Sequence, residues 1–450
     1  MERVAFFLII IIIITFISIH GVPASPKACT KVSTLFVFGD SYLDAGNNNY
    51  INTSAFDQAN FQPYGENFAN GPTGRFSDGR IIHDFIAEYA KLEGLIPIYL
   101  NKNRSGTQNY IGMNFASAGA GALTETLQGF VIDLKTQLKY YKKEVHHLKG
   151  AFGGAKAESV ISNAIHMMSI GSSDYISPFL LNDSFLHSFC QPSDYVNLVI
   201  ANISEAIQTI YANGGRNVVL MNMGPLGCLP GMKIIKNVNK YENKCMTEAL
   251  ELGKLHNTAL ETKLIPSLKK LPKLKLLVYD FQSDISNMIA EPKKYGLCDV
   301  KDACCGSGSF RGIHNCGGQR KPLSTEYKLC LKPENYLFWD SYHYTEKANE
   351  QVAKGMHAQR CENTFGPLIM DLALANALAT CENSLGRESS YSLELFARSW
   401  IDVRVANMLV LKMPLDKDNT LNRSSSTKPT KHRKSKEKQR KEKNDTKRTK

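Results

Sequence analysis

The sequence predicts an α/β protein: a three-layer α/β/α sandwich built on a central five-stranded parallel sheet. Two observations lead to this fold class. Short apolar runs recur along the chain, and long segments with helical periodicity separate them. Because strands that alternate with helices form a parallel sheet covered on both faces, the three layers follow from the order of the elements. The predicted strands span residues 35–38, 110–115, 165–170, 217–221 and 274–279.

Three of the intervening segments show the spacing of an amphipathic helix. Apolar residues recur every three or four positions over residues 127–141, 196–210 and 260–268. Stripes of this kind face a core far more often than they bind a cofactor, so we assign them to packing. A further helix is expected after His343, with Thr345 as its N-cap.

The first predicted strand ends at Gly39, and Ser41 follows at its carboxyl end, the edge at which open α/β sheets bind ligands. A serine there is a candidate nucleophile. It needs a base, a group that orients the base, and donors for an oxyanion. The segment Asp340-x-x-His343 supplies a base and its orienting carboxylate on a loop before a helix. No Gly-x-Ser-x-Gly is present, which disfavours the nucleophile elbow of α/β-hydrolases.

The length and composition fit one large globular domain with appendages. The chain has 450 residues, of which 43% are hydrophobic and 21% charged. Its formal net charge of +12 is uneven, because residues 423–450 hold thirteen Lys and Arg against three acidic residues, which leaves about +2 for the remainder. We interpret residues 25–378 as the main domain and residues 379–450 as an atypical C-terminal extension that ends in a basic, disordered tail.

The N-terminus has the form of a secretory signal peptide over residues 1–24. A charged start leads into an apolar run over residues 5–19, and small residues precede the expected cleavage after Ala24. The alternative is a single membrane anchor, but the run falls short of the roughly 20 residues that span a bilayer. We therefore expect a secreted, extracellular protein. For such a protein the basic tail fits acidic cell-wall polysaccharide or a membrane surface better than nucleic acid, although an appendage without function is the simpler interpretation.

Secretion gives the eleven cysteines a meaning: most should pair in disulfides, and an odd total leaves at least one over. Five of them crowd the loop-like segment 298–330. A zinc site is the alternative there, but no Cys-x-x-Cys pair is present and the histidines are wrongly spaced, so we favour disulfides and expect no metal. Sequons at Asn52, Asn103, Asn182 and Asn202 predict N-glycosylation on surface loops.

Ordered blocks of sequence surround and separate the candidate residues. They are Phe36-Val37-Phe38-Gly39-Asp40-Ser41, then residues 72–80 (Pro-Thr-Gly-Arg-Phe-Ser-Asp-Gly-Arg), 114–121 (Asn-Phe-Ala-Ser-Ala-Gly-Ala-Gly), 171–175 (Gly-Ser-Ser-Asp-Tyr), 224–230 (Gly-Pro-Leu-Gly-Cys-Leu-Pro), 303–306 (Ala-Cys-Cys-Gly) and 338–343 (Phe-Trp-Asp-Ser-Tyr-His). From about residue 35 to residue 355 the chain thus resembles the plant-type GDSL esterase/lipase family of the SGNH hydrolase superfamily.

The resemblance implies a role for each matched position. The family's nucleophile falls on Ser41, and its acid and base fall on Asp340 and His343. Its oxyanion hole uses the N–H of Ser41, the N–H of Gly119 and an asparagine side chain, which this chain replaces with Ser173. A hydroxyl reaches less far than a carboxamide, and losing one oxyanion donor costs about 10²–10³ in turnover.

Two smaller departures from the family pattern flank the candidate residues. Tyr42 stands beside the nucleophile where leucine is usual, a change in packing that should be tolerated. Tyr344 stands after the base where proline is usual, which removes a φ constraint and is expected to loosen His343.

These observations predict a secreted serine ester hydrolase that cleaves carboxylic esters or lipids through an acyl-enzyme. We expect a small-molecule ester or lipid as its substrate, no cofactor and no nucleic-acid partner. The alternative, from a different class, is a catalytically weakened relative that acts as a binding or modifier protein. Ser173 is the residue that motivates this alternative.

Overall fold

The computed structural model describes residues 32–69, 71–101, 109–181, 191–236, 244–317 and 326–362. The predicted signal peptide lies outside these residues, as do residues 363–450. The sequons at Asn103 and Asn182 also lie outside them. The boundary expected at residue 378 therefore stays a prediction.

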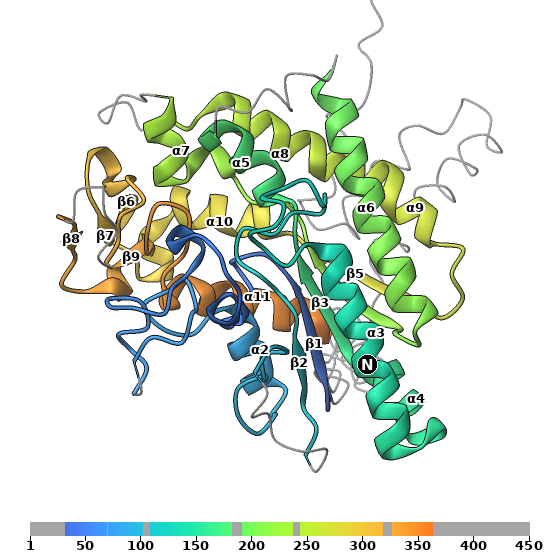
Figure 1. The fold of residues 1–450 in the computed structure, drawn as a ribbon. Helices are drawn as coiled ribbons and strands as arrows, with labels where there is room; N and C mark the ends of the chain where they lie inside the picture. The colour runs from blue at the N-terminus through green and yellow to red at the C-terminus, as the bar shows by residue number, and fades with distance from the viewer. Residues whose placement is uncertain are drawn as a thin grey trace, which may run out of the picture. The chain divides into compact units, whose positions relative to one another are not determined.

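The centre of the molecule is a five-stranded sheet in which every pairing is parallel, with the strand order β2-β1-β3-β4-β5 (Figure 1). The predicted fold class is confirmed, and each predicted strand is present with ends that differ by a few residues. The strands are β1 (Leu35–Gly39), β2 (Gly112–Asn114), β3 (Ile165–Ser169), β4 (Asn217–Met221) and β5 (Lys275–Tyr279).

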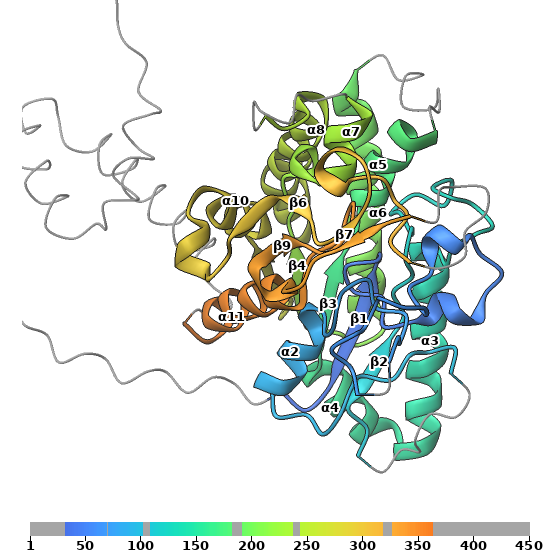
Figure 2. The ribbon, with the colours of Figure 1, turned by 90° about the vertical axis from the view of Figure 1, so that its left-hand side faces the viewer.

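Helices cover both faces of this sheet, which explains why β1 is apolar along its whole length. All five residues of β1 are buried. On one face, Tyr141 of α3 (Leu134–Phe152) packs its ring edge-on against Phe36 and Phe38, with centroids 5.3 and 5.4 Å apart. Figure 2 shows α2 (Ile82–Tyr89) and α11 (Glu346–Glu362) on the opposite side of the sheet from α3.

The remaining helices connect the strands or lie near their carboxyl ends. They are α4 (Gly154–Asn163), α5 (Ser172–Leu181), α6 (Pro192–Ala212), α7 (Pro230–Ile235), α8 (Thr247–Ala259), α9 (Ile265–Leu268) and α10 (Phe281–Ala290). A π-helical turn over Leu260–Leu264 joins α8 to α9, so the predicted helix 260–268 is the end of a longer one. Thr345 caps α11 as predicted, since its Oγ1 accepts a hydrogen bond from the Ala348 N–H at 3.2 Å.

One helix start was predicted wrongly. The apolar spacing suggested a helix from residue 127, but α3 begins at Leu134. Leu127 has a φ of 47°, which a right-handed helix excludes, and Asp133 stops the helix from extending backwards by capping the Thr136 N–H at 3.0 Å. Leu127 and Val131 therefore belong to a loop, and that loop contacts the candidate site.

The cysteine-rich segment contains short strands that the sequence did not predict. β6 (Asp299–Ala303) pairs with β9 (Tyr336–Phe338), and β7 (Cys305–Gly306) pairs with β8 (Lys328–Leu329). Disulfides join Cys304 to Cys330 and Cys305 to Cys316, as the preference for disulfides over zinc predicted. A further disulfide joins Cys228 to Cys245, and Cys298 is a free, exposed cysteine.

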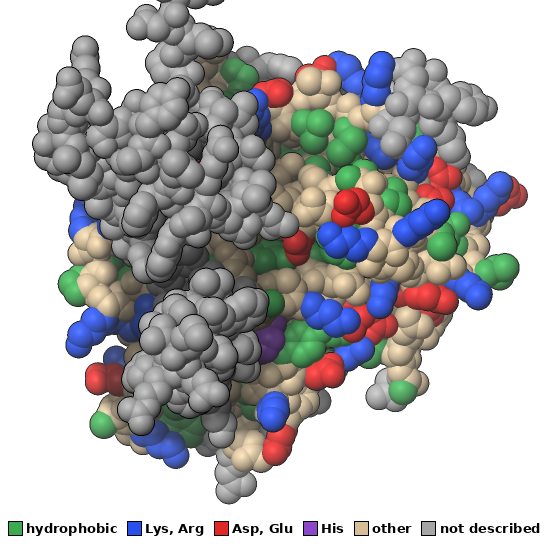
Figure 3. All heavy atoms as spheres, turned by 180° about the vertical axis from the view of Figure 1, so that it is seen from behind, with side chains coloured by type: hydrophobic (Ala, Val, Ile, Leu, Met, Phe, Trp, Pro, Cys, Tyr) green, Lys and Arg blue, Asp and Glu red, His purple; other side chains and the backbone are tan. Residues whose placement is uncertain are grey.

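The surface bears on the remaining sequence predictions. Asn52 lies in an exposed loop, as expected of a glycosylation site. Asn202, in contrast, lies within α6, where its Nδ2 donates to the Leu198 carbonyl at 2.9 Å; the loop position predicted for this sequon is wrong, because the helical periodicity of 196–210 continues through it. Within the described ranges, no helix is both long and apolar enough to cross a membrane. On the face shown in Figure 3, Lys and Arg side chains alternate with Asp and Glu.

Candidate active site

Ser41 lies just beyond β1, on a turn that begins at Gly39. Gly39 has a φ of 137°, and a Cβ atom there would collide with the carbonyl oxygen of Ser169 on the neighbouring strand. This close approach lets the Asp40 N–H donate to the same carbonyl at 3.1 Å. The chain then turns, because the amides of Leu43 and Asp44 both donate to the Asp40 carbonyl. Ser41 emerges half-buried at the carboxyl edge of the sheet.

The structure brings Ser41, His343 and Asp340 together in one hydrogen-bonded row. The Nε2 atom of His343 lies 2.8 Å from the Ser41 Oγ. Its Nδ1 atom lies 2.7 and 2.9 Å from the two carboxylate oxygens of Asp340. Because a carboxylate only accepts, Nδ1 carries the proton and Nε2 is free to accept one from the serine hydroxyl. This is the geometry that a nucleophile, a base and an orienting acid require.

Asp340 is completely buried, and its surroundings favour the ionised form. Burial by itself raises the pKa of Asp340, but the neighbouring His343 and the hydrogen bonds outweigh burial and hold the pKa below its usual range. The backbone amides of Tyr342 and His343 each donate to Oδ1 at 2.9 Å. On the other side, the buried Tyr64 donates its hydroxyl to Oδ2 at 2.7 Å. Asp340 is therefore a fixed carboxylate with donors on both oxygens.

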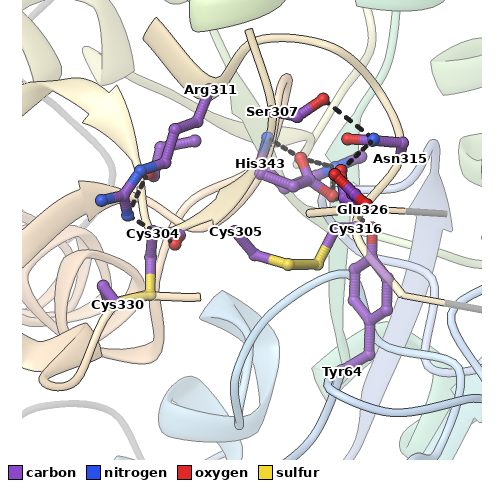
Figure 4. The surroundings of a disulfide bond; sticks show 12 residues. Tyr64, Cys304, Cys305, Ser307, Arg311, Asn315, Cys316, Glu326, Cys330 and His343 are labelled. Carbon is purple, nitrogen blue, oxygen red and sulfur yellow. Dashed lines mark hydrogen bonds and ion pairs between the residues drawn. A yellow bond between two sulfur atoms is a disulfide. The ribbon is translucent and has the colours of Figure 1, made fainter. Parts of the chain in front are cut away.

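The loop that carries Asp340 and His343 is tied to the disulfide-bonded segment. The Cys304 N–H donates to the Phe338 carbonyl, and the Cys305 N–H donates to the Trp339 carbonyl at 2.7 Å. Figure 4 shows the Cys305–Cys316 disulfide near His343, the Cys304–Cys330 disulfide farther to the left, and Tyr64 on a separate loop. The loop is also closed on itself, because the Trp339 N–H donates to the His343 carbonyl at 2.8 Å.

The start of α5 approaches the nucleophile turn from the next strand of the sheet. Ser172 donates its hydroxyl to Asp40 Oδ2 at 2.5 Å, and Asp40 Oδ1 accepts the Tyr42 N–H. Burial raises the pKa of Asp40 to about 7, while these hydrogen bonds oppose the shift. Ser173, the residue at the family's asparagine position, is the second residue of α5 and is 9% exposed. The hydrogen bond from Ser172 to Asp40 thus ties the start of α5, which includes Ser173, to the residue before Ser41.

The two backbone amides expected in the oxyanion hole differ from those around them. Within the described part of the chain, neither the Ser41 N–H nor the Gly119 N–H donates a hydrogen bond. Gly119 has a φ of 78°, a conformation that favours glycine, and a Cβ atom there would press against the side chains of Asp57, Leu127 and Val131. Their neighbours along both loops all donate: the amides of Asp40, Tyr42, Leu43, Asp44, Ser117, Ala118 and Ala120. Among the described residues, both amides thus lack a protein acceptor, and they lie on two loops that the hydrogen bonds from Ser117 to Gly39 and from Ala118 to Asp44 join.

The two tyrosines that depart from the family pattern lie against each other. The rings of Tyr42 and Tyr344 are 5.5 Å apart, and both contact Phe281. Tyr344 is 3% exposed and also packs on Phe338. The loosening of His343 expected from the missing proline is therefore opposed by aromatic packing on both sides of the residue that replaces it.

Sequence reasoning missed several residues that support the site. Tyr64 and Ser172 were not singled out, because each acts on a residue far away in the chain. The polar run Asn47-Asn48-Asn49 carried the only usable signal, since uncharged amides so close to a nucleophile predict buried hydrogen bonds. Asn47 and Asn48 are indeed buried, and both donate to carbonyls of the loop that contains Gly119.

Comparison with known proteins places this geometry in a family. The model of the GDSL-like Lipase/Acylhydrolase family matches residues 35–356. The GDSL esterase/lipase 5 of Arabidopsis thaliana is 46% identical over 323 residues, which cover 72% of this chain and 82% of that protein. GDSL esterase/lipase 1 of the same plant is 43% identical over 325 residues, covering 72% and 86%. A GDSL lipase of Tanacetum cinerariifolium is 40% identical over 334 residues, covering 74% and 86%.

A solved structure adds little to this result. An α/β hydrolase enzyme from the metagenome of Lake Arreo covers 74% of this chain and 96% of its own, but at 13% identity and a TM-score of 0.31 it carries no argument. The family model covers the strand, loop and helix segments that build the candidate site. The chain belongs to the GDSL-like lipase/acylhydrolase family.

Proposed function

We propose that this protein is a secreted serine ester hydrolase that acts on carboxylic esters or lipids, with Ser41 as nucleophile, His343 as base and Asp340 as orienting acid. The observation that carries the proposal is the continuous row of short contacts from Asp340 through His343 to Ser41 Oγ. The names of its relatives, which are esterases and lipases, support the substrate class. Disulfides persist in oxidising compartments, and this supports export.

The reaction divides into two half-reactions at one serine. In the first, the Ser41 hydroxyl proton moves to His343 Nε2 while Oγ bonds the acyl carbon; the ester C–O bond then breaks, and the leaving alkoxide takes the proton from Nε2. In the second, a water molecule gives a proton to Nε2 and attacks the acyl-enzyme. The bond to Oγ breaks, Oγ regains the proton, and the carboxylic acid leaves. Asp340 stabilises the imidazolium that forms in each half.

Two backbone donors would stabilise the tetrahedral intermediate. Among the described residues, the Ser41 and Gly119 amides have no protein acceptor. Both can therefore donate to an oxyanion without first breaking another hydrogen bond. In the sequence, Ser173 occupies the position of the family's third donor. No residue in this mechanism calls for a metal or an organic cofactor.

Hydrolysis of p-nitrophenyl acetate and butyrate by the secreted protein, with Ser41→Ala measured beside it, tests this function. We expect Ser41→Ala to lose at least about 10³ in kcat/KM, because without its nucleophile the site retains only binding and oxyanion stabilisation. Equal rates for the two proteins would refute the hydrolase.

Ser173 keeps a second candidate function open: a weakened relative that works as a binding or modifier protein. Ser173→Asn separates the two. If the native site lacks an effective third donor, the added carboxamide should raise kcat by about 10²–10³. A native enzyme that is already fast, and that Ser173→Asn leaves unchanged, removes the reason for the second candidate.

A further inference from the structure

The side chain of Asn48 connects the nucleophile loop to the loop that carries Gly119. It is 1% exposed. Its Nδ2 donates to the Ala118 carbonyl at 2.9 Å and to the Asp57 carbonyl at 2.8 Å. Its Oδ1 accepts the Ser117 hydroxyl at 2.5 Å. Both N–H groups and the oxygen of the carboxamide therefore bond to this one loop and to Asp57.

The orientation of this carboxamide follows from its partners. The atom assigned as Nδ2 faces two backbone carbonyl oxygens, which can only accept. An inverted amide would place its oxygen against both carbonyls and lose both hydrogen bonds. Ser117 Oγ also accepts the Ile132 N–H at 3.0 Å, so its proton is free to be donated to Asn48 Oδ1.

The bond to Ala118 determines where the Gly119 N–H points. The Ala118 carbonyl and the Gly119 N–H belong to one peptide unit, which is planar and trans, so the two groups point in opposite directions. Holding the carbonyl toward Asn48 directs the N–H away from it. The preceding peptide is held as well, because the Ala118 N–H donates to Asp44 Oδ2 at 3.0 Å. Gly119 itself, with a φ of 78°, has the conformational freedom to rotate if this restraint is removed.

We propose that Asn48 is a positioning residue that aims the Gly119 N–H at the oxyanion by holding the Ala118 carbonyl. This inference deepens the proposed hydrolase function and rests on it for its catalytic consequence. The structural part, that Asn48 orients one particular peptide, stands independently of activity and has its own measurement.

NMR of selectively labelled protein reports on that peptide directly. Labelling the alanine carbonyl carbons with ¹³C and the glycine nitrogens with ¹⁵N selects Ala–Gly peptides, of which the sequence contains Ala45–Gly46, Ala118–Gly119 and Ala120–Gly121. We expect Asn48→Asp to shift or broaden the Gly119 amide signal, because a carboxylate cannot donate to the Ala118 carbonyl. The Gly46 and Gly121 signals serve as internal references. An unchanged Gly119 signal in this variant would overturn the inference.

Asn49→Asp is the matched control, since it places the same change one residue further along. Asn49 Nδ2 donates to the Thr73 carbonyl at 2.9 Å, and among the described residues its side chain makes no hydrogen bond to the Gly119 loop. Both variants should lose thermal stability. Only Asn48→Asp should lower kcat, by about 10²–10³ with KM within about threefold, and weaken binding of butaneboronic acid, a tetrahedral transition-state analogue, by a similar factor.

The outcomes separate the inference from the proposed function. If wild type and Ser41→Ala hydrolyse esters equally, the hydrolase function is refuted, and the Gly119 signal still decides whether Asn48 orients the peptide. If the wild type is active and Asn48→Asp matches Asn49→Asp in kcat and in boronate binding, Asn48 has a structural role only, and the inference is wrong. A loss of kcat and boronate affinity confined to Asn48→Asp supports it.

Discussion

The two sides of the candidate site are held in place by different physical means. On the serine side, the turn at Ser41 and the loop at Gly119 are fixed by buried hydrogen bonds that the Asp44 carboxylate accepts and that the Asn47 and Asn48 side chains donate. On the acid–base side, the loop at Asp340 is held by backbone hydrogen bonds from Cys304 and Cys305, both of which are in disulfides. The serine side therefore depends on polar groups staying in their native protonation state, and the acid–base side depends on covalent links. Acid and loss of disulfides should damage them separately.

The largest effect is expected at the centre of the acid–base side. Asp340→Asn keeps the size of the side chain but removes the carboxylate that fixes the His343 tautomer, so kcat should fall by about 10⁴. Single-turnover kinetics and thermal melting of the variant, with Ser41→Ala as the lower limit, provide the measurement. A folded Asp340→Asn protein that keeps more than about a tenth of the activity would show that His343 works without its acid.

Removal of a disulfide tests the covalent part of the comparison. Cys304→Ala/Cys330→Ala opens a link across 26 residues and Cys228→Ala/Cys245→Ala one across 17, so each pair should cost about 3 kcal/mol of stability. Only the first pair should also lower kcat, by about tenfold or more, because the Cys304 N–H holds the Phe338 carbonyl two residues before Asp340. Equal losses of kcat in the two double variants would show that the Cys304–Cys330 disulfide has no special role in holding the Asp340 loop.

Acid should act through one buried neutral histidine that contacts α5, the helix whose Ser172 bonds to Asp40 beside the nucleophile. His256 contacts Tyr175 of α5, with 2.8 Å between Nδ1 and the hydroxyl, and burial lowers the pKa of His256 to about 3. Below pH 6.5 the folded state then binds fewer protons than the unfolded state. The stability that comes from keeping His256 neutral is therefore complete above pH 6.5 and is lost as the pH falls toward 3. Between pH 7 and 5 the loss should be about 2 kcal/mol.

Urea unfolding at the two pH values measures this loss. His256→Gln should be less stable at pH 7, yet it should lose about 2 kcal/mol less than wild type on going to pH 5. His146→Gln, on the exposed face of α3, is the control and should keep the wild-type difference. The same pH dependence in wild type and His256→Gln would remove His256 as the cause.

The smallest effect concerns a single hydroxyl on the acid–base side. Tyr64→Phe keeps the ring between Phe76 and Trp339 but removes the donor to Asp340, so kcat should fall by about tenfold with little change in KM. Tyr141→Phe removes a comparable buried hydroxyl, bonded to His166 in the sheet core, and should affect stability alone. If the two variants have the same kcat, Tyr64 is a packing residue.

The five strands of the central sheet and the three candidate catalytic residues could be predicted because their signals are local. The apolar run 35–38 followed by Gly39 predicts the end of a strand. The spacing of Asp340-x-x-His343 by itself places a base and a carboxylate on one loop. The helix start near residue 127 was misjudged for a related reason: periodicity reports which residues face the core but not where the backbone leaves the helical region.

What the tertiary structure alone decided is how these residues are held. The bonds from Tyr64 to Asp340, from Ser172 to Asp40 and from Asn48 to Ala118 join residues 276, 132 and 70 positions apart. No spacing in the sequence encodes such pairs, because a hydroxyl or carboxamide can serve many partners equally well. Their partners are chosen only when the sheet has formed and burial makes an unsatisfied polar group costly. The sequence thus determined which groups could do the chemistry, and the packed fold determined the direction in which each one points.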